Sequence, residues 1–163
     1  MNEPNIALTY YHQDLSLRRT NYYHPSVEYI NKNNILPSIL RFATQEIALT
    51  AEMVNFHFSE IARLSTHIIE QEIADQPNYT IITSLYLSRA IEFAIVQDYT
   101  SAIDDCTRAA LHAHKQLEPI IYFCRANWRY RLLEYQRATG EQQATNAMDF
   151  DIMLKDYDQV IKL

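Results

Sequence analysis

The chain has 163 residues, a length typical of one domain, with 48% apolar side chains, a single glycine (Gly140) and a formal net charge of −6. Sheets with tight hairpins use glycine in their turns, so this composition argues against such folds and favours an all-α chain. The sequence lacks the basic stripe of a nucleic-acid-binding protein, and no apolar run reaches the ~18 residues needed to insert across a membrane.

The first part of the chain, residues 1–49, shows no regular periodicity. Pro25, Pro37 and a run of asparagines interrupt it, so we expect an irregular N-terminal segment. The alternation of apolar and polar residues within 40–49 suits either a strand or a poor helix. The first residues lack the basic and apolar parts of a signal peptide, which slightly favours a cytoplasmic protein. The compartment stays open, as does whether the chain is a fragment of a longer repeat protein.

Residues 50–72 carry a helical pattern. Thr50 has a side-chain oxygen that can cap the first turn, and an apolar stripe at helical spacing follows it, formed by Val54, Phe58, Ile61, Ser65 and Ile68. The helix should end before Pro77, because proline disfavours helical backbone in the residue that precedes it.

The next three segments alternate between two kinds of helix. Residues 79–96 are apolar on nearly every side, as expected of an inner helix that packs on two faces. After a short turn at Gln97 and Asp98 comes an amphipathic outer helix with one stripe of small residues, namely Ala102, Cys106, Ala109 and Ala113. A second inner helix is predicted from Pro119 to Leu133.

Several residues recur 36 positions later along the chain. The pairs are Tyr86 and Tyr122, Arg89 and Arg125, Ala90 and Ala126, Asp98 and Glu134, Tyr99 and Tyr135, and Ala102 and Ala138. A small residue lets two helices approach closely, and an acid at the start of a helix complements the helix dipole. The spacing predicts two helix–turn–helix units, about 79–118 and 119–163, with turns near Asp98 and Glu134.

These positions resemble the tetratricopeptide repeat (TPR), whose pattern places an aromatic residue, a small residue and later an alanine at fixed spacing. The first unit matches at Tyr86, Arg89, Ala90, Phe93, Ala102 and Cys106, and the second at Tyr122, Arg125, Ala126, Tyr135 and Ala138. The second unit departs at Arg129, where an aromatic residue is expected, and a polar stretch near 139–152 resembles an insertion. The resemblance covers residues 79–163 and implies a TPR-like α-α superhelix. An ordinary helical bundle is the alternative.

The resemblance also implies a function. TPR proteins typically bind a peptide or partner protein on the concave face that their inner helices line. Carrying over the family's groove-facing positions gives the peptide-binding candidates Leu87, Ile91, Phe123, Asn127, Tyr130 and Arg131. An asparagine can hydrogen-bond a peptide backbone, and an arginine can pair with a carboxylate. The apolar candidates have an alternative role as plain core beneath the N-terminal segment.

The sequence contains no recognisable catalytic or metal-binding motif. His112 and His114 point to different faces of a predicted helix, and His57 and His67 lie too far apart for one ion. The two cysteines lack metal-type spacing and are interpreted as small buried thiols. We therefore expect a non-enzymatic binding module without a cofactor, and an enzyme on a helical scaffold is the least favoured hypothesis.

The C-terminal end gives a second hypothesis. Its last helix carries an apolar stripe that no following repeat covers, formed by Met153, Leu154, Tyr157, Val160 and Ile161. Burying one such side chain is worth roughly 1.5–3 kcal/mol, so leaving several exposed is unfavourable. A homodimer through this end, or a further repeat of a longer protein, would cover them. The alternative function is therefore a structural or assembly protein that self-associates.

Overall fold

The computed structural model describes residues 49–140 and 146–162, and all regular structure in these ranges is helical. The helices are α4 (Ala51–Glu72), α5 (Tyr79–Ile95), α6 (Tyr99–Ala110), α7 (Glu118–Thr139) and α8 (Asn146–Lys162). The all-α prediction is confirmed for this part of the chain. The expected irregular segment 1–49, including the ambiguous pattern at 40–49, lies outside the described residues except for its last position.

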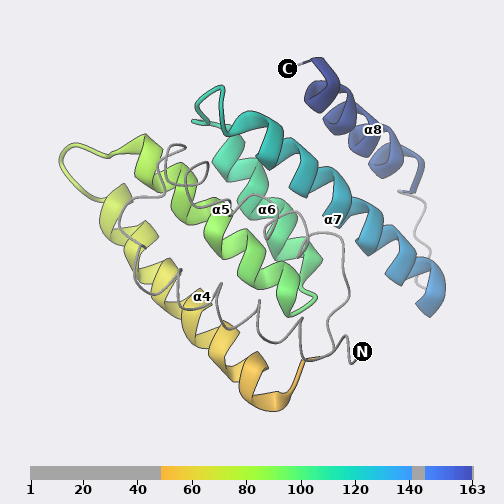
Figure 1. Ribbon diagram of the computed structural model, residues 1–163, viewed down its shortest axis with the longest axis horizontal. Coiled ribbons are helices and arrows are strands. Elements are labelled where there is room, and N and C mark those ends of the chain that lie inside the picture. The colour runs from red at the N-terminus through yellow and green to blue at the C-terminus, as the bar shows by residue number, and fades with distance from the viewer. Residues whose placement is uncertain (1–48, 141–145, 163) are drawn as a thin grey trace, which may run out of the picture.

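The helices form a row in chain order. Figure 1 shows α4 at one side, followed by α5, α6 and α7, with α8 at the other side. Each helix packs mainly on the next one along the chain, so that α5 contacts α4 and α6, and α7 contacts α6 and α8. Such a linear series of nearest-neighbour contacts is characteristic of proteins built from stacked helix pairs.

Three predicted helix starts are capped by side chains. The backbone N–H of Met53 donates to Thr50 Oγ1 at 3.3 Å, and that of Ser101 donates to Asp98 Oδ1 at 3.1 Å. Asn78 caps α5 in the same way. These bonds satisfy backbone donors that the first turn of a helix leaves without partners. The predicted helix end before Pro77 and the predicted turn at Asp98 are both confirmed.

The inner helix α5 is buried on nearly all sides, as its apolar sequence predicts. The stripe predicted for α4 is partly wrong, because Phe58 is 54% exposed while His57 and Leu64 are fully buried. The buried face includes a histidine because its ring nitrogen Nδ1 lies 2.5 Å from Glu92 Oε2 on α5. A polar residue can be buried when it is hydrogen-bonded, and a search for apolar periodicity overlooks it.

The second unit is arranged differently from the prediction. The prediction of a turn near Glu134 is wrong, because α7 continues to Thr139. The helix ends at Gly140, which has a left-handed backbone conformation (φ 73°). Glu134 does not cap a helix and instead accepts a hydrogen bond from the Tyr130 hydroxyl one turn earlier. Ala138, the predicted counterpart of the buried Ala102, is exposed. Of the insertion expected near 139–152, residues 146–152 belong to α8, and residues 141–145 lie outside the described part of the chain.

Candidate functional site

An arginine on α5 binds an aspartate on α6 through two hydrogen bonds. Arg89 Nε and Nη2 donate to the two carboxylate oxygens of Asp105, both at 2.7 Å. The Asp105 side chain is only 4% exposed, and the guanidinium lies 5.4 Å from the centre of the Tyr86 ring. Hydrogen bonding to Asp105 raises the pKa of Arg89. This two-bond geometry fixes the relative position of the two helices.

The same arrangement recurs in the second unit. Arg125 Nε and Nη2 donate to Asp156 at 2.8 and 2.6 Å, and the guanidinium lies 5.2 Å from the Tyr122 ring. The tyrosine and the arginine both recur 36 positions after those of the first unit. The aspartate is the exception, because 31 residues separate it from its arginine here and 16 in the first unit. The second unit is therefore about 15 residues longer between these partners.

Through its pairing with Arg125, Asp156 of α8 holds the position that Asp105 holds in α6. When Asp156 is aligned with Asp105, Asp149 and Phe150 of α8 become equivalent in sequence to Asp98 and Tyr99 of α6. The acid–aromatic pair thus recurs in α8, and the predicted match at Glu134 and Tyr135 is a chance similarity within α7. This match could have been found from the sequence, because Asp98–Tyr99 and Asp149–Phe150 each consist of an aspartate followed by an aromatic residue.

Arg129, which departs from the TPR pattern, also contacts α8. Its Nη1 lies 3.8 Å from Asp149 Oδ1, and its Nε lies 3.8 Å from Asp156 Oδ2. Burial, together with the neighbouring Arg125, lowers the pKa of Arg129. Two arginines of α7 therefore face two aspartates of α8, and the aromatic residue expected at this position is replaced by an electrostatic contact.

Each arginine of the repeated arrangement also contacts the preceding outer helix. Arg89 Nη1 donates to Ser65 Oγ on α4 at 2.9 Å, and Arg125 Nη1 donates to Thr107 Oγ1 on α6 at 3.3 Å. Each arginine thus joins three helices, namely its own, the following one and the preceding one. The contact between α4 and α5 thus resembles the contact between α6 and α7.

The predicted peptide-binding residues divide into three places. Leu87 and Ile91 are 4% and 5% exposed and belong to the hydrophobic core. Phe123 packs edge-on against Tyr157 of α8, with ring centres 6.3 Å apart. Asn127, Tyr130 and Arg131 share one face of α7 at helical spacing, in a region where Asn127 is buried, Arg131 is half-buried and Tyr130 is 43% exposed. The structure therefore brings Phe123, Asn127, Tyr130 and Arg131 to one face of α7, where Tyr157 of α8 packs against Phe123, and leaves the other two candidates in the core.

A small cavity that the sequence did not indicate lies beside α4, α5 and α6. Its volume is about 160 Å³, and its lining includes Glu72, Tyr86, Arg108 and His112. The Tyr86 hydroxyl donates to Glu72 Oε1 at 2.6 Å, and burial is the main cause that raises the Tyr86 pKa. The Arg108 guanidinium lies 5.9 Å from the Tyr86 ring centre. The polar groups that line the cavity therefore contact one another across the three helices.

The two cysteines are unsuited to nucleophilic chemistry. Cys106 and Cys124 are fully buried free thiols. Burial raises the pKa of both, that of Cys124 to about 12. The thiolate is the reactive species, so these side chains are poor nucleophiles at neutral pH.

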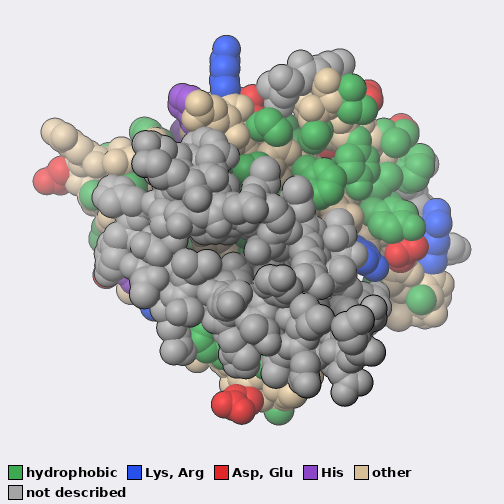
Figure 2. Space-filling model, in the orientation of Figure 1, with side chains coloured by type: hydrophobic (Ala, Val, Ile, Leu, Met, Phe, Trp, Pro, Cys, Tyr) green, Lys and Arg blue, Asp and Glu red, His purple; other side chains and the backbone are tan. Residues whose placement is uncertain are grey.

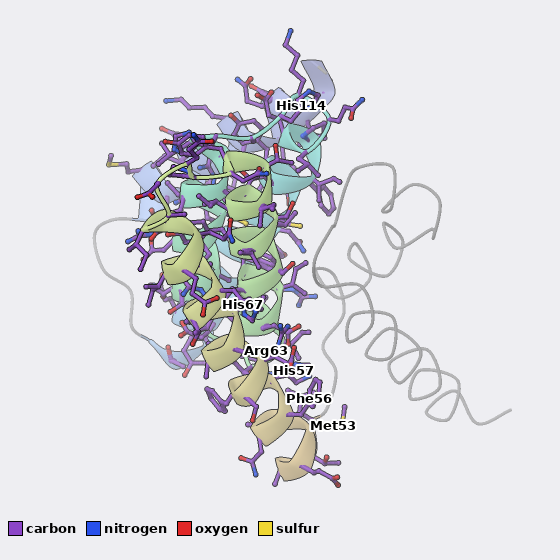
Figure 3. The ribbon with its side chains drawn as sticks, turned by 90° about the vertical axis from the view of Figure 1, so that its left-hand side faces the viewer. Met53, Phe56, His57, Arg63, His67 and His114 are labelled. Atoms are coloured by element: carbon purple, nitrogen blue, oxygen red, sulfur yellow. The ribbon has the colours of Figure 1, made fainter. Side chains whose placement is uncertain are left out.

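The histidines of the described residues do not form a metal site. Figure 3 shows His57 and His67 at different heights along α4, with His114 at the far end of the molecule. Within 49–140 and 146–162, no three histidine, cysteine or acidic side chains are placed to share a metal ion. No described helix is long and apolar enough to span a membrane.

Comparison with protein-family models, with curated proteins and with solved structures found no match. The repeated arrangement is therefore supported only by contacts within this chain. Its recurring elements are a tyrosine and an arginine on the inner helix and an aspartate on the outer helix that follows.

Proposed function

We propose that the protein is a non-enzymatic protein–protein interaction module, built from TPR-like helix pairs, that binds a peptide or partner protein along the inner face of α7. The observation that carries this proposal is the repeated tyrosine–arginine–aspartate arrangement. It joins α5 to α6 and α7 to α8 in the same way, within a row of helices that contact mainly their neighbours. Stacked helix pairs of this kind provide extended surfaces for partners.

The repeated contacts also favour a superhelical stack over an ordinary bundle. In a bundle, the helices surround one core and their pairings need not repeat along the chain. Here each inner-helix arginine contacts the preceding and the following outer helix in the same manner. A constant relation between successive units, repeated along the chain, generates a superhelix with a concave inner side.

The proposed binding residues are Asn127, Tyr130 and Arg131 on α7. Tyr130 is the most accessible of the three, and tyrosine and arginine are enriched among the residues that dominate interface energies. Arg131 supplies a guanidinium for a carboxylate, and Asn127 supplies an amide for a peptide backbone. Leu87 and Ile91 are buried on α5 and are not part of this face. The net charge of −6 makes a nucleic acid an unfavourable partner.

An affinity purification with matched variants tests this function. The tagged 163-residue chain is used to capture proteins from cells that naturally express it, and the captured proteins are identified by mass spectrometry. The test variant combines Tyr130→Ala with Arg131→Ala. The control combines Tyr135→Ala with Arg137→Ala, which removes the same residue types from exposed positions near the end of α7.

We expect a captured partner to be lost from the test variant and kept by the control, while both variants retain the helical circular dichroism of the natural chain. A partner kept by both variants would place the binding surface elsewhere. A reaction catalysed by the purified chain would contradict the non-enzymatic proposal.

A further inference from the structure

The three outer helices share four equivalent positions. The arginine contacts align Ser65 of α4 with Thr107 of α6, and the aspartates align Asp105 of α6 with Asp156 of α8. In this alignment one stripe runs along each helix, formed by His57, Ile61, Leu64 and Ile68 in α4, by Tyr99, Ile103, Cys106 and Ala110 in α6, and by Phe150, Leu154, Tyr157 and Ile161 in α8.

The stripe is covered in the first two outer helices. In α4, His57, Leu64 and Ile68 are at most 2% exposed, and His57 contacts α5 through Glu92. In α6, Ile103 is 7% exposed and Cys106 is fully buried. Each of these helices is followed by an inner helix that packs on it. Burial of the stripe therefore accompanies the contact between an outer helix and the next inner helix.

Three of the four stripe residues are exposed in α8. Phe150 is 44% exposed, Leu154 is 45% exposed and Ile161 is 82% exposed. The adjacent side of α8 packs on α7 through Met153 and Asp156, which are 4% and 3% exposed. Tyr157, at the border between this side and the stripe, is half-buried against Phe123 of α7. In Figure 1, α8 is the last helix of the row, and Figure 2 shows hydrophobic side chains gathered at this end of the molecule. The exposed stripe of α8 is therefore an apolar face at the position that is covered in α4 and α6.

A charged residue stands beside this stripe. The hydroxyls of Ser65 and Thr107 each accept a hydrogen bond from the arginine of the following inner helix. The equivalent residue of α8 is Asp158, which is exposed. A carboxylate binds a guanidinium more strongly than a hydroxyl does, because the bond is then charge-assisted on both sides. The position that contacts an arginine in the earlier units is thus acidic at the open end.

We propose that the stripe formed by Phe150, Leu154, Tyr157 and Ile161 is a docking surface for an amphipathic helix of another protein. That helix lies on α8 as α7 lies on α6, with its apolar side on the stripe. It carries an arginine whose guanidinium pairs with Asp158. This surface shares no residue with the α7 face described above, so the proposal goes beyond the proposed function and does not depend on it.

A second copy of the chain is a less suitable occupant. In a symmetric dimer the same surface serves both subunits. Asp151 and Asp158 are exposed two helical turns apart along one edge of the stripe. An antiparallel pair of α8 helices centred on the stripe would bring these acidic edges of the two copies together, and like charges repel at such distances. A separate helix with an arginine at this position instead neutralises the acidic edge.

A displayed library of amphipathic helical peptides, each as long as α7, is the probe for this surface. All peptides have an apolar stripe, and the flanking positions are randomised. The library is selected on the 163-residue chain, and the enriched peptides are measured by fluorescence anisotropy. The test variants are Leu154→Arg and Asp158→Arg. The control is Gln159→Arg, which adds the same charge at an exposed position of α8 outside the stripe.

We expect the enriched peptides to carry an arginine beside the apolar stripe. Both test variants should weaken binding at least about tenfold, whereas the control should change it less than about twofold. Replacing the peptide arginine with aspartate should restore binding to the Asp158→Arg variant. All three variants replace exposed residues, and matching thermal unfolding curves confirm that each variant is folded.

Three results would overturn the proposal. One is a failure to select any helical peptide, and another is the selection of peptides whose affinity is unchanged by Leu154→Arg. The third is a dimer in light scattering that Leu154→Arg dissociates, because a second copy would then occupy the stripe. Loss of partners through Tyr130→Ala and Arg131→Ala leaves this test unaffected, so the two proposals can fail separately.

Discussion

Arg125 and Asp156 form a two-bond pair across α7 and α8, with distances of 2.8 and 2.6 Å. Arg89 and Asp105 form the same pair across α5 and α6. The two pairs set the register of their helices because each guanidinium meets a nearly buried carboxylate at one position only. Loss of either partner would leave the charge of the remaining partner without a counter-charge in a largely buried place.

Replacing Asp156 with alanine should destabilise the protein strongly. The Arg125 guanidinium, whose side chain is 14% exposed, would lose its partner, and breaking such a buried pair costs about 3 kcal/mol or more. The free energy of unfolding from urea titrations measures the effect. Asp158→Ala is the control, because Asp158 is exposed on the same helix and its replacement should change stability by about 0.5 kcal/mol at most. Equal effects of the two substitutions would contradict the role given to the pair.

Ala102 and Ala138 should respond differently to the same substitution. Ala102 is fully buried where α5 meets α6, so Ala102→Leu should cost about 1–3 kcal/mol by overpacking. Ala138 is exposed in the last turn of α7, and Ala138→Leu should leave the melting temperature nearly unchanged. Thermal unfolding followed by circular dichroism compares the two variants. A large loss in Ala138→Leu would restore the register that the 36-residue spacing first predicted.

The buried thiol of Cys124 should make stability fall at high pH. Its pKa is about 12 in the folded chain against 9.0 for an unperturbed thiol. A folded-state pKa above the unfolded value gives stability that is complete below pH 9 and is lost as the pH rises toward 12. In this window the unfolded thiol ionises first, which weakens folding by about 1.4 kcal/mol per pH unit.

Urea unfolding at several pH values between 9 and 12 measures this slope. Other groups titrate there as well, so the informative quantity is the difference between the natural chain and Cys124→Ala. We expect the variant to lose stability less steeply, whatever its stability at neutral pH. Parallel curves for the two proteins would show that the thiol contributes nothing to the pH dependence.

Two left-handed residues should respond in opposite directions to substitution. Gly140 (φ 73°) follows α7, and Gln97 (φ 65°) follows α5. Gly140→Ala should lower stability by about 1 kcal/mol, because a side chain disfavours this backbone conformation. Among the described residues other than its chain neighbours, no atom lies within 4 Å of the position that its Cβ would take, so the cost is conformational and not steric. Gln97→Gly should raise stability by up to about 1 kcal/mol. Chemical denaturation that shows the same sign for both variants would contradict this explanation.

Local patterns in the sequence were enough to predict the helices and the first unit. Thr50 and Asp98 cap helices because their side-chain oxygens reach backbone donors one turn away, an interaction that needs no other part of the chain. The apolar residues of α5 require cover on several sides wherever the helix lies. The 36-residue recurrence of tyrosine and arginine also reflects two inner helices that hold these residues in equivalent places.

Tertiary contacts alone determined which helix pairs with Arg125 of α7. A surface loop can lengthen at small entropic cost, so sequence spacing does not reveal where the partner of Arg125 lies. Glu134 and Tyr135 match the spacing but belong to the extended α7, whereas Asp156 is placed by its hydrogen bonds. Burial of His57 likewise required Glu92 on another helix. Helical periodicity is a local property of the chain, but the pairing of charges and the covering of faces depend on which segments meet.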